Sequence, residues 1–354
     1  MFNTLLYLAI IEIGVKSCAA LNTDSLTTPA SKLRYLLSQS IKSNHAIAVP
    51  GVHDSLCARI FAQNKSPVLF VSGFGVSATY LGQPDAGILT LSEMEEVTRN
   101  IVRATSQNCD DIIPVIVDGD TGYGGAPNIR RTIRNLASAG AAAITIEDQV
   151  FPKKCTYAAG ENVKVITRSE ACDRIRTAIA AREQARVIDG NDVLIIARTD
   201  CRAALGFDEV VKRCEAFQEL GADIVYAENL QSREEYIKLR KTLDENTPMM
   251  LAQLQLATIS KSEKQIDSNK QTLYSMRDVR DMGYNLALFG VTALQASVCT
   301  LQSLAQGFQQ NKVFYDVDNE SEKDSSVTLS PFSTVKEVVG FTDLDQFERK
   351  YSCL

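Results

Sequence analysis

Histidine is scarce in this 354-residue chain, which contains only His45 and His53. Two histidines argue against a histidine-rich zinc site and leave carboxylates as the side chains that could hold a metal. Nine cysteines are present, but no two form a C-x-x-C pair, so neither a zinc ribbon nor a thioredoxin motif is identified. Any bound metal should therefore be hard, Mg²⁺ or Mn²⁺, and the scattered thiols favour a reducing compartment.

Excess positive charge and long apolar runs are also lacking. The net charge is -6 at pH 7, and no basic stripe with interleaved aromatic residues occurs, which argues against a nucleic acid partner. The apolar run 5–15 is broken by Glu12 and is too short for stable membrane insertion. It resembles a signal peptide core but lacks a basic start. Residues 1–28 are therefore either a targeting segment or a plain extension, and the compartment stays open between cytoplasm and organelle.

Apolar runs without alternation recur from residue 46 onward, and such runs are typical of strands buried on both faces. They are 46–49, 68–71, 112–117, 143–146, 193–197, 223–227, 249–252 and 286–289. Segments with helical periodicity lie between them, as at 92–106, 128–139, 169–188, 208–220 and 233–243. This α/β alternation predicts a closed (β/α)₈ TIM barrel over 29–310. A doubly wound sheet with a small second domain is the alternative.

Three further segments surround the predicted barrel. A helix is expected at 292–308, followed by an acidic, serine-rich linker at 316–326. Residues 333–351 have the pattern of a helix pair that docks on the barrel base or on a neighbouring subunit, so 311–354 is expected to be a linker and helical tail. The lysine-bearing stretch 260–272 follows the seventh strand and is either a lid or an inert insertion.

Acidic residues follow four successive predicted strands, where barrel enzymes have their active sites. Carboxylates gathered at one mouth repel each other unless a cation lies among them, and Mg²⁺ meets that need. In Asp118-Gly119-Asp120 the acids are two residues apart and can face one metal. The alternative is that individual acids cap helices or pair with arginines. The acids are Asp118, Asp120, Glu147, Asp148, Asp200 and Glu228.

Two other short segments carry groups suited to chemistry. Ser72-Gly73 offers a hydroxyl and approachable N–H groups for a carboxylate or phosphoryl group, although a glycine turn without a ligand is the alternative. Cys155 follows Lys153 and Lys154 in an expected loop. Neighbouring ammonium groups lower a thiol pKa, so Cys155 could exchange a proton with a carbanion.

Eight motifs in order make the chain similar to the isocitrate lyase and phosphoenolpyruvate mutase superfamily from about residue 33 to 305. They are P-G-V-H-D (50–54), V-S-G-F-G (71–75), G-Q-P-D (82–85), V-D-G-D-T-G-Y-G (117–124), I-E-D-Q (146–149), P-K-K-C (152–155), A-R-T-D (197–200) and G-Y-N-L-A-L-F (283–289). The resemblance implies a Mg²⁺ cofactor, a barrel whose last helix is exchanged between subunits, and a homotetramer.

The resemblance also implies roles for individual residues. Asp118 is similar to the direct metal ligand, and Asp85, Asp120 and Glu147 to acids that hold the metal largely through water. Ser72 and Gly73 resemble the seat of a substrate carboxylate, and Arg198 the cation that neutralises a developing oxyanion. Cys155 stands at the position of the lyases' gate-loop thiol, where the mutases usually carry asparagine. Glu228 or a metal-bound water is the candidate for removing a hydroxyl proton, and Gln253 is the candidate for binding substrate.

The resemblance at these residues implies a Mg²⁺-dependent lyase or hydrolase that breaks a carbon-carbon bond in a small 2-hydroxy or 2-oxo diacid through an enolate. Oxaloacetate, dimethylmalate and methylisocitrate are examples of such diacids. Thr156 and Tyr157 stand where the lyases have glycine and histidine, and Gln253 where asparagine is usual. These departures put isocitrate and methylisocitrate in doubt. A carboxyvinyl-carboxyphosphonate-type phosphonomutase and a non-catalytic barrel are the rival interpretations.

Overall fold

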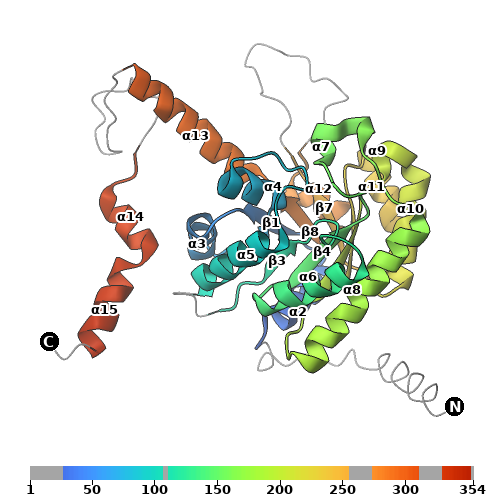
Figure 1. Cartoon of the computed structure of the whole chain (residues 1–354), viewed down its shortest axis with the longest axis horizontal. Helices are drawn as coiled ribbons and strands as arrows, with labels where there is room; N and C mark the ends of the chain where they lie inside the picture. The colour runs from blue at the N-terminus through green and yellow to red at the C-terminus, as the bar shows by residue number, and fades with distance from the viewer. Residues whose placement is uncertain (1–26, 107–110, 255–272, 311–328, 352–354) are drawn as a thin grey trace.

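The computed structural model describes residues 27–106, 111–254, 273–310 and 329–351 (Figure 1). Its parallel strands close into a barrel in which each strand pairs with the next and β8 pairs with β1. The strands are β1 Ile47–Val52, β2 Leu69–Val71, β3 Val115–Asp118, β4 Ala143–Glu147, β5 Leu194–Thr199, β6 Ile224–Ala227, β7 Met249–Ala252 and β8 Leu286–Phe289. The barrel prediction is confirmed, and the doubly wound alternative is wrong.

Helices alternate with the strands and form the outer layer. They are α2 Pro29–Ser43, α3 Ser55–Gln63, α5 Leu91–Ser106, α6 Ala126–Ser138, α8 Arg168–Ile188, α10 Phe207–Glu219, α11 Arg233–Thr242 and α12 Met276–Asp281. Short helices lie in the loops after β2, β4 and β5, at α4 Gly73–Val76, η3 Ser77–Leu81, α7 Thr156–Ala159, η4 Gly160–Asn162 and α9 Arg202–Leu205. After β8 come α13 Thr292–Gln309, α14 Phe332–Val339 and α15 Phe341–Tyr351.

Several strand boundaries differ from the expected ones by one to three residues, and the start of β3 is one of the largest shifts. β3 begins at Val115 rather than at residue 112, because Pro114 has no N–H to contribute to a ladder and only its carbonyl bonds to β2. The Pro114 carbonyl accepts the N–H of Leu69 at 3.0 Å. The strand is therefore shorter than its apolar run, and its carboxyl end still reaches Asp118.

Alternate strand residues fill the barrel interior. Phe70, Ile116, Leu194, Ile196 and Tyr226 belong to one buried cluster, while their chain neighbours pack outward against the helices. Leu33 and Leu37 of α2 are buried in the same cluster and close the end of the barrel at which the strands begin. Because the interior is packed with side chains, only the carboxyl ends of the strands are left to form a site.

The C-terminal helices α13, α14 and α15 extend away from the barrel (Figure 1). α13 exposes Val298, Leu301 and Phe308. The tail contacts α3, where Nε of Arg59 donates to the Val338 carbonyl at 2.5 Å. The expected helix (α13) and helix pair (α14 and α15) are thus present. The exchange of a helix between subunits and the homotetramer stay predictions, because one chain is described. None of the described helices is long and apolar enough to cross a membrane. Segments 1–26, 316–326 and 260–272 lie outside the described residues.

Candidate active site

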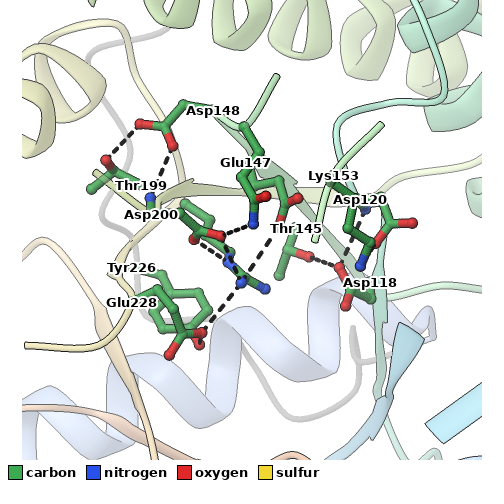
Figure 2. Close-up of polar contacts among 12 residues, drawn as sticks. Asp118, Asp120, Thr145, Glu147, Asp148, Lys153, Thr199, Asp200, Tyr226 and Glu228 are labelled. Carbon is green, nitrogen blue, oxygen red and sulfur yellow. Dashed lines mark hydrogen bonds and ion pairs between the residues drawn. The ribbon is translucent and has the colours of Figure 1, made fainter. Parts of the chain in front are cut away.

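The period of two along the strands places polar side chains in the barrel mouth. Asp118 continues the inward row of Ile116 on β3, and Glu147, Arg198 and Glu228 do the same at the ends of their strands. Figure 2 shows Asp118, Glu147 and Glu228 in the same region of the barrel mouth. Asp148 is one residue further along and points away from the mouth, where it accepts a hydrogen bond from Arg213 of α10 at 2.8 Å. Pairing with an arginine is the alternative that the sequence left open for individual acids.

A cavity of about 590 Å³ opens at this end of the barrel. Its polar lining includes Ser72, Asp85, Asp118, Lys153, Cys155, Arg198, Glu228 and Gln253. Phe70, Phe74, Leu288, Leu294 and Val298 form an apolar part of the wall. Three predicted site residues lie just behind this lining: Gly73 approaches Asp118, Asp120 bonds to Lys153, and Glu147 lies 3.4 Å from Arg198. The predicted site residues therefore gather at one mouth.

Arg198 is held by three carboxylates. Its Nε and Nη2 lie 2.6 and 2.9 Å from the two oxygens of Asp200, and its Nη2 lies 3.4 Å from both Glu147 and Glu228. The guanidinium also stacks over the Tyr226 ring at 5.4 Å. Burial alone would lower the pKa of Arg198, but the surrounding carboxylates raise it well above its usual value. The cavity therefore contains a permanent, oriented positive charge.

Lys153 supplies a second buried cation. Its Nζ lies 2.6 Å from Asp85 Oδ1 and 2.7 Å from Asp120 Oδ1, and its side chain is 4% exposed. Burial raises the pKa of Asp120 to about 7, with Lys153 opposing the shift and Asp118 adding to it. Two protein cations therefore already offset part of the negative charge, and repulsion among the acids does not by itself require a metal, contrary to the expectation from the sequence.

The remaining acids fit a hard cation. Both carboxylate oxygens of Glu147 are buried and have no hydrogen-bond partner among the described residues, and burial raises its pKa well above the usual range. Asp118 accepts the Thr145 hydroxyl at 3.1 Å through Oδ1. Oδ2 of Asp118 faces Gly73 so closely that an added Cβ would lie 2.9 Å away. No three Asp, Glu, His or Cys side chains of the described segments form a ready-made metal cluster. The carboxylate oxygens of Asp118 and Glu147 nevertheless supply the hard donors that Mg²⁺ prefers.

Cys155 lies at the start of α7, in the loop after β4. Its N–H donates to the Asp85 carbonyl at 3.1 Å, and its side chain lines the cavity. Burial raises the pKa of the thiol, so the expected lowering by adjacent lysines is wrong. The reason is geometric, because Lys153 turns toward Asp85 and Asp120. A protonated thiol is suited to donate a proton.

Comparisons with known proteins support this architecture. The family model described as phosphoenolpyruvate phosphomutase matches residues 37–307. The chain belongs to this family. A 2,3-dimethylmalate lyase of Eubacterium barkeri is 30% identical and covers 91% of this chain and 98% of its own. The petal death protein of Dianthus caryophyllus is also 30% identical, over 92% of both chains.

Solved structures of the phosphoenolpyruvate mutase and isocitrate lyase superfamily are similar to this family member. Oxaloacetate acetylhydrolase with 3,3-difluorooxalacetate has a TM-score of 0.74 at 27% identity, covering 91% of this chain and 97% of that one. A phosphonopyruvate hydrolase in complex with oxalate and Mg²⁺ has a TM-score of 0.70 at 25% identity, covering 92% and 99%. The protein is thus an enzyme of this superfamily, and the non-catalytic interpretation is set aside.

Sequence reasoning missed several residues that this family member uses to build the site. Asp200 was counted as an acid at the mouth but not as the partner of Arg198, a role that its two-residue spacing from Arg198 could have indicated. Tyr226 and Tyr157 both donate to Glu228, the latter at 2.9 Å to Oε1. No local pattern in the sequence marks Tyr226, whereas Tyr157 stands where the lyases have histidine.

Two of the predicted substrate-binding residues also have partners within the protein. Ser72 Oγ accepts the Gly75 N–H at 3.1 Å as the N-cap of α4. Gln253 Oε1 accepts the Tyr274 N–H at 2.5 Å, and its Nε2 donates to the Tyr274 carbonyl at 3.1 Å. Both side chains line the cavity. A substrate that bonds to the Gln253 amide would have to compete with the Tyr274 main chain.

Proposed function

We propose that the protein is a Mg²⁺-dependent lyase or hydrolase that cleaves a carbon-carbon bond in a small 2-hydroxy or 2-oxo diacid through an enolate. The observation that supports this most is the joint presence of a charged Arg198 and a protonated Cys155 on the wall of one acid-lined cavity. An oriented cation and a proton donor are what an enolate or carbanion intermediate requires. Relatives named for dimethylmalate and oxaloacetate agree with this substrate class.

Asp118, Asp85, Asp120 and Glu147 are the residues that would hold Mg²⁺. When bound, Mg²⁺ would polarise the oxygens of the substrate as a Lewis acid. The buried oxygens of Glu147, which accept no hydrogen bond from the described residues, support this assignment. The structural relative that binds oxalate together with Mg²⁺ supports the pairing of this cation with a dicarboxylate. Mn²⁺ has the same preference for oxygen and is the alternative.

Residues of the chain itself would bind the substrate, stabilise its charge and transfer protons. The Ser72 hydroxyl and the backbone at Gly73 would bind a substrate carboxylate, and Arg198 would stabilise negative charge that develops on the substrate oxygen. Glu228 would remove the proton of the substrate hydroxyl, or, for a 2-oxo diacid, of the hydroxyl formed when water adds to the carbonyl, since burial raises the pKa of Glu228 and makes it a better base. Cys155 would protonate the carbanion carbon. The apolar wall would keep water from that carbanion.

A phosphonomutase acting on phosphoenolpyruvate or a carboxyphosphono analogue is the rival function. The two functions differ in the bond that changes, so product identification separates them. We expect carbon-carbon cleavage of a diacid such as dimethylmalate or oxaloacetate, and no conversion of phosphonopyruvate. Turnover of phosphonopyruvate without turnover of any diacid would favour the rival.

Mg²⁺ is expected to raise the melting temperature of the protein. Binding to the folded state alone stabilises by about 2.7 kcal/mol at a hundredfold excess over Kd. Thermal unfolding measured at increasing Mg²⁺ concentration would reveal this without any substrate. Asp118→Asn should abolish this rise in melting temperature. Asp189 forms an exposed ion pair with Arg134, and Asp189→Asn should retain the rise. Equal shifts in wild type and Asp118→Asn would contradict the assignment of the metal ligand.

A further inference from the structure

The loop 151–162 that carries Cys155 is attached to the barrel on both sides of the thiol. On the near side, the Lys154 N–H donates to Gln149 Oε1 at 3.0 Å. On the far side, the Tyr157 hydroxyl donates to Glu228 Oε1 at 2.9 Å. Cys155 therefore lies between one attachment at the end of β4 and another at the end of β6.

Glu228 is a well-fixed anchor for the second attachment. Its other oxygen accepts the Tyr226 hydroxyl, and the Asn229 N–H donates to Oε1 at 3.1 Å. Arg198 Nη2 lies 3.4 Å from Oε2. Tyr226 and Arg198 belong to strands of the barrel. The position of this carboxylate is thus set by the barrel, independently of the loop.

The helix that Tyr157 belongs to cannot fix its own orientation. α7 comprises Thr156–Ala159, and its N–H groups at Ala158 and Ala159 bond back to the Cys155 carbonyl at 3.0 and 2.9 Å. Helix formation is cooperative, so a single turn is not stable alone and depends on tertiary contacts. The Cys155 N–H is bonded to the Asp85 carbonyl at 3.1 Å, but its carbonyl starts the turn, so a change in the placement of α7 still reorients Cys155.

We propose that Tyr157 is a positioning residue whose hydrogen bond to Glu228 holds the Cys155 thiol in the cavity. This inference rests on the proposed role of Cys155 as proton donor. Tyr157 itself lines the same cavity, so it sets the far edge of the space beside the thiol. Loss of its hydroxyl should let α7 leave the barrel end more often, which exposes the thiol and misplaces it relative to the substrate.

Alkylation of Cys155 by iodoacetamide, followed peptide by peptide with mass spectrometry, tests the inference without any substrate. Tyr157→Phe removes only the hydroxyl, and the rate at Cys155 should rise about tenfold, the effect of one lost hydrogen bond to a carboxylate. The fully buried Cys201 and Cys214 are internal references for global unfolding. Rates at several pH values separate a change in thiol pKa from a change in access.

Tyr80→Phe is the matched control. It removes a tyrosine hydroxyl that donates to a different glutamate, Glu96, and Tyr80 does not line the cavity, so the Cys155 rate should stay at the wild-type value. An unchanged rate in Tyr157→Phe, or an equal rise in both variants, would overturn the inference. In turnover, Tyr157→Phe should lower kcat about tenfold at unchanged KM. If alkylation responds as expected and wild type cleaves no diacid, the positioning role stands and the proposed function fails.

Discussion

Replacement of Cys155 by alanine is expected to lower kcat by about 10² to 10⁴-fold, the range that a positioned general acid contributes. KM should change little, because the thiol would act on the carbanion rather than on the bound ground state. Steady-state kinetics on a cleaved diacid measure both constants. The thiol must be protonated to donate, and burial raises its pKa. Activity should therefore persist above the usual thiol pKa of about 8.5 and fall only at higher pH.

Cys57→Ala is the control for this prediction. Cys57 lies on α3, where burial raises its pKa to about 11, and it does not line the cavity. Its replacement should leave kcat at the wild-type value. A Cys155→Ala enzyme with wild-type kcat would show that another group, or solvent, protonates the intermediate.

Arg198→Lys is expected to lower kcat by about 10² to 10³-fold, the usual effect of losing a positioned oxyanion partner. Lysine keeps the charge but not the planar fork that meets both oxygens of Asp200. The replacement ammonium would be drawn toward any of the three surrounding carboxylates, and the charge would no longer be fixed against the substrate. Single-turnover kinetics at saturating substrate would measure the loss in the chemical step.

Arg202→Lys is the matched control for Arg198→Lys. Arg202 also forms a two-pronged pair, with Glu235, but that pair lies outside the cavity. Its replacement should leave the chemical step unchanged. Melting temperatures of both variants would establish that the folds are intact. Equal activity of the two variants would contradict the proposed role of Arg198.

Much of the site could be predicted because strand geometry is local. Side chains alternate along a strand, so a polar residue at the end of a buried run points into the mouth when its parity matches the inward row. Asp118, Glu147 and Glu228 obey this rule. The closed barrel followed from the same runs, since residues buried on both faces need helices on the outside.

The rest depends on contacts between segments far apart in the chain. Lys153 could equally have faced Cys155, and only the folded loop turns it toward Asp85 and Asp120. The raised thiol pKa follows from burial, which sequence spacing does not report. The bond between Tyr157 and Glu228 joins residues 71 positions apart, so no local pattern could indicate it.

The most direct test of the proposed function is NMR product analysis of dimethylmalate and oxaloacetate incubated with the protein, first with Mg²⁺ and then with excess EDTA. We expect carbon-carbon cleavage of at least one diacid, its loss with EDTA and its recovery when Mg²⁺ is restored. Cleavage that survives EDTA would contradict the role of the metal. Conversion of phosphonopyruvate alone would contradict the carbon-carbon chemistry.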